Sequence, residues 1–179
     1  MTADANMVAL FKAELELCKV DATQTVAVLS EGYTRADYAQ AFMAAAMELG
    51  AHCFHVNLPP RSASQGFAGN MGRTAIEGNR AAIDALKSAD IVIDLMFLLF
   101  SKEQLEITDS GTRMLLVLEP VEVLSRMFPN EDLRRRVEFG AELLGRAKEM
   151  RITSPSGTDV RYELGKYPVV TEYGCTDTP

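Results

Sequence analysis

The polar side chains best placed for chemistry in this sequence lie where apolar, strand-like runs end. Ser30 and Glu31 follow the run TVAVL, and Asn57 lies near the end of HCFHVNL. Glu119 follows RMLLVL, and Asp94 lies within DIVIDLMF. Because ligands of an open α/β sheet bind at the carboxyl ends of its strands, these residues are candidates for a binding site. Asp94 and Glu119 are the stronger two, and a helix cap or a hydrogen bond to a loop explains each equally well.

The sequence does not offer the familiar nucleotide or metal motifs. A dinucleotide site needs a GxGxxG turn after the first strand, and the sequence there is LSEGYT, with one glycine and a carboxylate that would repel phosphate. His52 and His55 lie three positions apart on a predicted strand, so their side chains point to opposite faces and cannot share one ion. With only two histidines, neither a Ser–His–Asp set nor a two-histidine, one-carboxylate metal set can be assembled.

The elements that must position these residues alternate between helix and strand. Apolar stripes predict helices over residues 7–18, 35–49, 79–88, 102–109, 121–128 and 130–150. Continuous apolar runs predict strands over residues 25–29, 52–58, 90–97 and 113–118. Thr34 and Asn130 are the expected N-caps of two of the helices. Because parallel strands need crossover connections, the pattern predicts an α/β fold: a Rossmann-like open parallel sheet with helices on both faces.

Two stretches depart from this alternation. Residues 61–74 (RSASQGFAGNMGRT) have no hydrophobic period and form the longest predicted loop, in which Gly66, Gly69 and Gly72 are best explained as flexible positions. Residues 151–154 and 159–164 flank a Pro/Gly turn and predict a β-hairpin. We therefore expect an α/β domain over residues 1–149, and over residues 150–179 the start of a truncated second domain.

Length and composition exclude several classes of protein. The 179 residues carry a net charge of −7, and their pI is about 4.9, so a nucleic-acid partner is not expected. The longest apolar stretch, from Ile91 to Phe100, is interrupted by Asp94 and is far shorter than a membrane span. The acidic N-terminus lacks the pattern of a signal peptide, and three scattered cysteines fit reduced thiols, so the expected location is the cytoplasm.

Four stretches of the sequence resemble the N-terminal half of the 2,5-dihydroxypyridine 5,6-dioxygenase family. They are VDATQTVAVL, NRAAIDALKSADIVIDLMFLLFSKEQ, GTRMLLVLEPVEVLSRMFPNEDLRRRV and GKYPVVTEYG. Together they span nearly the whole chain, and EPVEVLSRM and YPVVTEYG are specific. Members of this family open the ring of hydroxypyridines, and they are related in fold to the aminopeptidase T metallopeptidases.

The resemblance implies that this chain is the N-terminal half of an iron(II)-dependent, extradiol-like dioxygenase. The substrate would be 2,5-dihydroxypyridine or a related hydroxylated N-heteroaromatic, and dioxygen would be the second reactant. In the family the Fe(II) ligands, a Glu, a His and an Asp, lie in the C-terminal half. Iron would therefore be bound outside this chain, which has no nameable metal ligand and would be inactive alone. The resemblance also implies a homo-oligomer, and residues 150–179 would begin the metal-binding domain.

Three residues match positions near the substrate in the family. Leu99 matches a substrate-facing leucine after the third strand, and Phe100 stands where the family has histidine. A phenyl ring can stack on a hydroxypyridine or close over it but carries no proton, so either the substrate differs or the proton is handled elsewhere. Glu172 in VTEYG matches a glutamate near the substrate. It would be a polar or acid/base contact, and a contact between domains or subunits is an equal alternative.

Two other functions compete with this one. An aminopeptidase T-like metallopeptidase shares the two-domain plan and would differ by a dinuclear metal site in the other half of the protein. A non-catalytic oligomerisation domain is the second alternative, because the motifs in this chain alone assemble no catalytic centre.

Overall fold

The computed structural model describes residues 4–60 and 75–178, and the predicted loop at residues 61–74 lies outside this range. The chain divides into two compact units. The first comprises Met1–Phe128 together with Cys175–Pro179, and the second comprises Pro129–Gly174. The predicted domain boundary between residues 149 and 150 stays a prediction.

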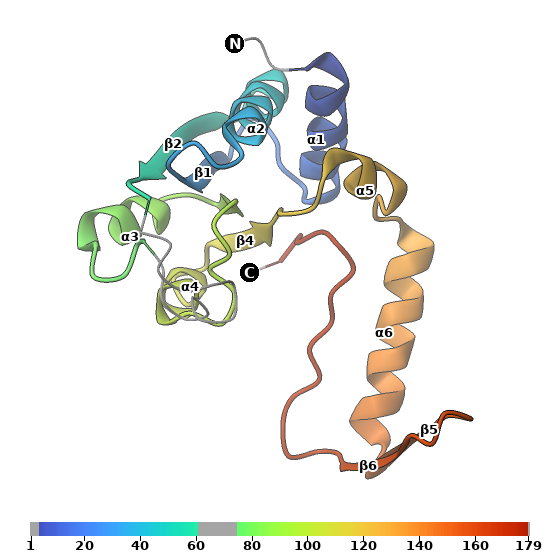
Figure 1. Cartoon of the computed structure of the whole chain (residues 1–179). Coiled ribbons are helices and arrows are strands. Elements are labelled where there is room, and N and C mark those ends of the chain that lie inside the picture. The colour runs from blue at the N-terminus through green and yellow to red at the C-terminus, as the bar shows by residue number, and fades with distance from the viewer. Residues whose placement is uncertain (1–3, 61–74, 179) are drawn as a thin grey trace. The chain divides into compact units, whose positions relative to one another are not determined.

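A four-stranded parallel sheet forms the centre of the first unit (Figure 1). Its strands are β1 (Thr25–Glu31), β2 (His52–Leu58), β3 (Ile91–Asp94) and β4 (Arg113–Leu116). They lie in the order β2-β1-β3-β4, and each neighbouring pair is parallel. This confirms the predicted open parallel sheet.

Helices cover both faces of this sheet, as predicted. The helices of the first unit are α1 (Ala5–Leu17), α2 (Ala36–Glu48), α3 (Arg80–Leu86), α4 (Lys102–Thr108) and α5 (Val121–Arg126). Val26 and Val28 of β1 belong to a buried cluster with α1 and α2, whereas Ala27 and Leu29 belong to a second cluster with α3 and α4. Alternate residues of one strand therefore face two cores, which explains why β1 is apolar throughout.

Side-chain caps begin several of the helices. Asp4, Asn79 and Ser101 each accept a hydrogen bond from a backbone N–H in the first turn of α1, α3 and α4 respectively. The predicted cap at Thr34 is wrong, because α2 begins two residues later and Arg35 occupies its cap position in the left-handed region with φ of +56°. The structure gives Arg35 no side-chain capping hydrogen bond.

The second unit contains one helix and one hairpin. The helix α6 (Glu131–Arg146) begins at the predicted N-cap Asn130, whose side chain accepts a hydrogen bond from the N–H of Leu133. The strands β5 (Glu149–Thr153) and β6 (Asp159–Glu163) pair antiparallel and confirm the predicted hairpin.

Within the described residues, no helix is both long and apolar enough to cross a membrane.

Candidate functional site

The loop between β3 and α4 carries two of the predicted site residues and is built around Asp94. This residue ends β3 and is only 2% exposed. Its carboxylate accepts hydrogen bonds from the backbone N–H groups of Met96 at 2.8 Å and Leu98 at 2.6 Å. Burial raises the pKa of the Asp94 carboxyl, and these backbone bonds act in the opposite direction. Asp94 therefore organises the loop, which is the structural alternative stated for it above.

Leu99 and Phe100 lie together at the end of this loop. Leu98 before them is fully buried, Leu99 is half-buried, and Phe100 is 73% exposed. The N–H of Phe100 donates a hydrogen bond to Oε1 of Gln104 at 2.6 Å. The loop is thus anchored by one leucine and displays the next two apolar side chains toward its surface.

Near the carboxyl end of β1, a serine forms a hydrogen-bonded pair with a histidine in the middle of β2. The Oγ of Ser30 lies 2.7 Å from Nε2 of His55, and Ser30 is only 1% exposed. Partial burial lowers the pKa of the His55 imidazole, which favours its neutral form. Because the Ser30 hydroxyl is buried, the pair is better suited to fixing the end of the sheet than to nucleophilic attack.

This pair could not be predicted from the sequence motifs. The two residues are 25 positions apart, and no local motif joins them. The register of the strands brings them together, since Val28 lies opposite His55 and Ser30 lies opposite Asn57. Only the alternation of side chains on the two strands, combined with that register, could have indicated the contact.

Glu119, the other acidic candidate, contributes its backbone to the structure described here. Its carbonyl oxygen accepts a hydrogen bond from the hydroxyl of Tyr38 at 2.8 Å, and its side chain is exposed. The neighbouring Leu118 carbonyl accepts from the guanidinium of Arg35, which also lies 4.7 Å from the centre of the Tyr38 ring. These contacts tie the start of α2 to the segment that follows β4.

Glu172 lies in the second unit and is exposed. The next residue, Tyr173, lies under the guanidinium of Arg134, 5.0 Å from the ring centre. A side chain at Gly174 would lie 2.6 Å from Cγ of Pro129, so the chain passes very close to that proline. The structure therefore places Leu99 and Phe100 side by side, and it describes Glu172 separately on a segment held within the second unit.

A cluster of polar groups lies where the last residues return to the first unit. Arg113 is buried and donates hydrogen bonds to the carbonyl oxygens of Cys18 and Thr176, the latter at 2.9 Å. The N–H of Thr176 donates to Sγ of Cys18 at 3.4 Å. Burial raises the pKa of the Cys18 thiol to about 12, so this thiol is not a reactive nucleophile. Burial also raises the pKa of the nearby Glu14 carboxyl to about 7.

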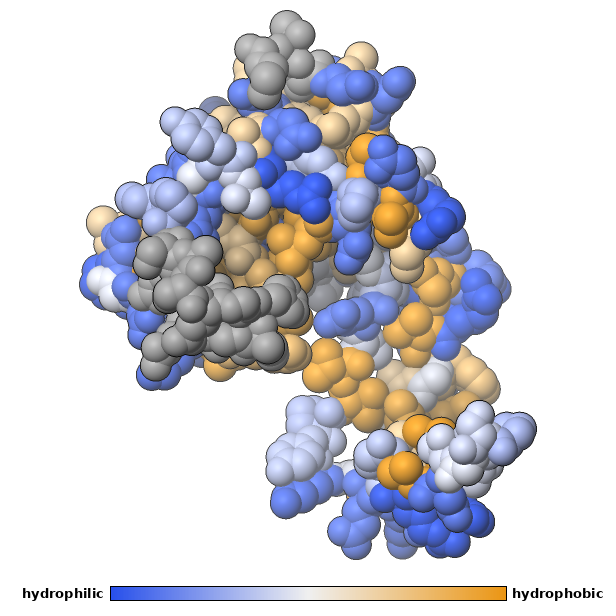
Figure 2. Space-filling model, viewed as in Figure 1, coloured by the Kyte–Doolittle hydropathy of each residue, from blue (hydrophilic) through white to orange (hydrophobic). Residues whose placement is uncertain are grey.

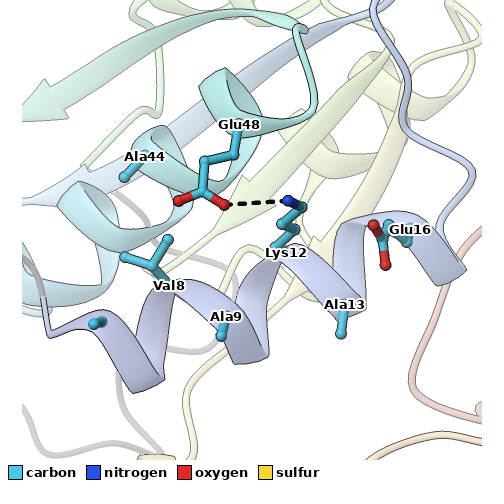
Figure 3. A pocket seen from close by; sticks show the side chains of 8 residues that line it. Val8, Ala9, Lys12, Ala13, Glu16, Ala44 and Glu48 are labelled. Atoms are coloured by element: carbon cyan, nitrogen blue, oxygen red, sulfur yellow. Dashed lines mark hydrogen bonds and ion pairs between the residues drawn. The ribbon is translucent and has the colours of Figure 1, made fainter.

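A shallow groove lies between α1 and α2 (Figure 3). Its lining is mostly small and apolar, and it includes Ala9, Ala13 and Ala44. Lys12 and Glu48 bridge the groove with an ion pair of 3.2 Å. Two of the three charged residues that line the groove thus pair across it, and none of the predicted site residues lines it.

The residues that the structure describes do not provide a metal site. Across positions 4–60 and 75–178, three or more His, Cys, Asp or Glu side chains nowhere gather in a way that could hold a metal ion. These residues therefore do not fit a metal ion by themselves, and the family resemblance implies iron(II) ligands that lie in the other half of the protein.

Apolar side chains gather on the surface of the second unit. Phe139 and Leu143 lie one helical turn apart on α6 and are 59% and 49% exposed. Figure 2 shows apolar surface between the charged side chains of this unit.

Comparison with known proteins gives one consistent result. The model of a family described as 2,5-dihydroxypyridine 5,6-dioxygenase matches residues 6–179. A 2,5-dihydroxypyridine 5,6-dioxygenase from Pseudomonas putida KT2440 is 43% identical over 181 residues, which cover 99% of this chain and 52% of the relative. The solved structure of 2,5-dihydroxypyridine dioxygenase from Pseudomonas putida KT2440 superposes with a TM-score of 0.93, covering 100% of this chain and 53% of that one. The chain thus spans about half the length of these relatives.

Proposed function

The chain belongs to the 2,5-dihydroxypyridine 5,6-dioxygenase family, and we propose that it forms the N-terminal, substrate-binding half of such an enzyme. The substrate would be 2,5-dihydroxypyridine or a related hydroxylated N-heteroaromatic, opened by dioxygen between C5 and C6. The observation that supports this proposal is the likeness to the Pseudomonas putida enzyme, which extends over 99% of this chain at 43% identity.

Leu99 and Phe100 would supply an apolar surface for the flat ring of the substrate. Phe100 is exposed on a loop whose backbone is held by Asp94 and Gln104, so its ring is available for stacking. A phenyl ring can orient an aromatic substrate and exclude water from it but cannot exchange a proton with it. The proton chemistry of ring opening would therefore fall to other groups.

Glu172 is the group of this chain that we assign to a polar or acid/base contact with the substrate. Its carboxylate is exposed, and the residues on its C-terminal side are held by the Arg134–Tyr173 contact and by the close approach of Gly174 to Pro129. A carboxylate on a fixed segment can accept a hydrogen bond from a ring hydroxyl and can take up its proton.

Iron(II) would be bound by residues outside this chain, because the family resemblance implies that its ligands lie in the C-terminal half. We also propose that the reaction is extradiol-like, that the protein is a homo-oligomer and that it is located in the cytoplasm. The reaction type and the oligomer rest on the family resemblance, and the location rests on the free cysteines.

An oxygen-uptake assay tests the proposed function. The complete gene product that contains these residues is loaded with iron(II) under anaerobic conditions and then given oxygen and 2,5-dihydroxypyridine. The expected result is the consumption of one oxygen molecule for each substrate molecule, with loss of the aromatic absorbance. Residues 1–179 expressed alone should consume no oxygen above background. Absence of uptake by the complete gene product with any dihydroxypyridine would overturn the proposal.

A matched pair of variants tests the role of the apolar loop. Phe100→Ala removes an exposed ring next to Leu99, whereas Leu105→Ala removes an apolar side chain of similar exposure from α4. We expect Phe100→Ala to raise KM by about three- to tenfold, the scale of a lost aromatic contact. Leu105→Ala should leave KM unchanged, and equal effects of the two variants would contradict the assignment.

A further inference from the structure

The backbone that carries Leu99 and Phe100 is held on its N-terminal side by a buried carboxylate. Asp94 accepts hydrogen bonds from the N–H groups of Met96 and Leu98, each with a different carboxylate oxygen. Leu98 is itself fully buried in the cluster between the sheet, α3 and α4. The first half of the loop is therefore fixed to β3 by backbone hydrogen bonds to the Asp94 carboxylate and to the core by the side chain of Leu98.

On its C-terminal side the same segment is held by α4. The side-chain oxygen of Gln104 accepts a hydrogen bond from the N–H of Phe100 at 2.6 Å. The backbone N–H of Gln104 in turn donates to Oγ of Ser101, the N-cap of the helix, at 3.0 Å. This is a reciprocal arrangement like a capping box, except that the returning side chain reaches the residue before the cap.

Two residues of the loop have a backbone conformation that residues other than glycine rarely adopt. Phe97 and Phe100 have φ values of +69° and +65°, in the left-handed region. Such conformations persist only where the surrounding structure imposes them, and they gather where a segment serves a function. The acceptors that oppose relaxation here are the side chains of Asp94 and Gln104.

We propose that Asp94 and Gln104 are positioning residues for the substrate-binding surface of Leu99 and Phe100. The inference rests on the proposed function, because it assumes that these two side chains contact the substrate. Neither Asp94 nor Gln104 need touch the substrate itself. Asp94 is buried under the loop, and Gln104 acts through the backbone of Phe100.

Substitutions at Gln104 can distinguish this positioning role from a merely structural one. Gln104→Ala removes the acceptor for the Phe100 N–H but keeps the hydrogen bond from its own backbone N–H to Ser101, so the cap of α4 stays intact. Alanine also favours the helix at that position. Gln104→Glu replaces the amide oxygen with a carboxylate oxygen that can accept from the same N–H, and glutamate, like glutamine, is typical of this point of a capping box. The two variants thus differ mainly in whether Phe100 is held.

The experiment compares these variants in the complete gene product loaded with iron(II). Oxygen uptake with 2,5-dihydroxypyridine gives kcat and KM, and hydrogen exchange of the peptide over residues 96–101 reports the order of the loop. We expect Gln104→Ala to raise KM by about three- to tenfold with kcat within about twofold of wild type, the scale of one lost hydrogen bond. Exchange over residues 96–101 should accelerate, and Gln104→Glu should restore both quantities.

Asp94→Asn should act in the same direction and more strongly, because one of its two carboxylate acceptors becomes a donor that faces a backbone N–H. Since a substitution at a buried residue can also impair folding, the comparison of Gln104→Ala with Gln104→Glu is the decisive test of the positioning role. Unchanged KM in Gln104→Ala beside an active wild type would overturn the positioning role, and so would unchanged exchange. A wild-type enzyme that consumes no oxygen would instead overturn the proposed function together with the substrate role of the loop.

Discussion

Phe100 is the residue at which this chain departs from the pattern that the family resemblance implies, in which a histidine would stand there. The two side chains are both flat and aromatic, and both can stack on a ring. They differ in that an imidazole titrates near neutral pH and can move a proton, whereas a phenyl ring cannot. The difference therefore concerns proton handling more than substrate shape.

Phe100→His should introduce a pH dependence into ring opening by the complete gene product. We expect kcat/KM to gain an additional titration near the ordinary histidine pKa of about 6.5, because the new imidazole exchanges a proton with the substrate. The measurement is kcat/KM for 2,5-dihydroxypyridine from pH 5.5 to pH 8.5. Phe100→Leu is the matched control and should lack this titration. Identical pH profiles for the His and Leu variants would show that the side chain at position 100 does not reach a titrating atom of the substrate.

Glu14 should make the stability of the first unit depend on pH. Burial raises the pKa of its carboxyl from 4.5 to about 7, so the folded state favours the protonated form. Protonated Glu14 therefore contributes its full stability below pH 4.5. The free energy of unfolding decreases as pH rises from 4.5 through about 7, and above that Glu14 causes no further change.

Glu14→Gln should remove the decrease in the free energy of unfolding that Glu14 causes as pH rises, because glutamine does not titrate. Relative to wild type, we expect the variant to gain about 1 to 2 kcal/mol of unfolding free energy between pH 4.5 and pH 8, less than the full pKa shift implies because the side chain is partly exposed. Urea denaturation at both pH values measures the gain. Glu16→Gln, on the exposed side of the same helix, is the control. An equal gain in both variants would contradict the assignment to Glu14.

At the scale of elements, the sequence predicted the sheet and its helices well, because apolar runs and cap residues are local signals. The end of β3 shows what local signals miss. The apolar run predicted a strand over residues 90–97, but β3 ends at Asp94, since its carboxylate binds the N–H groups of Met96 and Leu98 and turns the chain into a loop.

The contacts that shape the candidate site were less predictable. The Ser30–His55 pair depends on strand register, and the Gln104–Phe100 bond depends on a left-handed backbone in a residue that rarely adopts it. Neither condition can be seen in the order of residues alone. Leu99 and Phe100 are predicted as site residues by the family resemblance alone, and the structure adds the means by which their loop is held.

The backbone after Tyr173, at the end of the second unit, depends on a glycine. Gly174 has φ of +91°, and a Cβ there would lie 2.6 Å from Cγ of Pro129. Gly165 has nearly the same φ, +90°, but an added Cβ would meet nothing within 4 Å. Comparing alanine substitutions at the two positions thus distinguishes the cost of backbone strain from the cost of a steric clash.

Gly165→Ala should cost about 1 to 2 kcal/mol for the left-handed conformation alone. Gly174→Ala should cost about 1 to 3 kcal/mol more, because Pro129 must also move. Urea denaturation of the complete gene product measures both values. Because Gly174 follows the segment of Glu172, oxygen uptake should fall in Gly174→Ala and not in Gly165→Ala. Equal costs in the two variants would show that Pro129 yields freely.

At the scale of the whole molecule, the two units differ in how they are stabilised. The first has a sheet with a buried hydrophobic cluster on each face. In the second, none of residues 129–174, all of which the structure describes, is buried. Its helix is supported by Asn130 as N-cap and by ion pairs one turn apart, such as Arg134 with Glu138 at 2.8 Å. Exposed ion pairs of this kind contribute little, about 0.3 to 0.5 kcal/mol each.

Hydrogen exchange on residues 1–179 alone should therefore show two levels of protection. An isolated helix of this length is marginal in water, so the amides of α6, which has 16 residues, should exchange within about tenfold of the unfolded rate. The helix α1 is an internal control, because its 13 residues include the buried Val8, Phe11 and Leu15. Its amides should be protected by the stability of the first unit. In the complete gene product, α6 should gain protection as Phe139 and Leu143 are covered. Protection of α6 equal to that of α1 in residues 1–179 alone would contradict this, and would mean that the apolar side of α6 already has a partner in that chain.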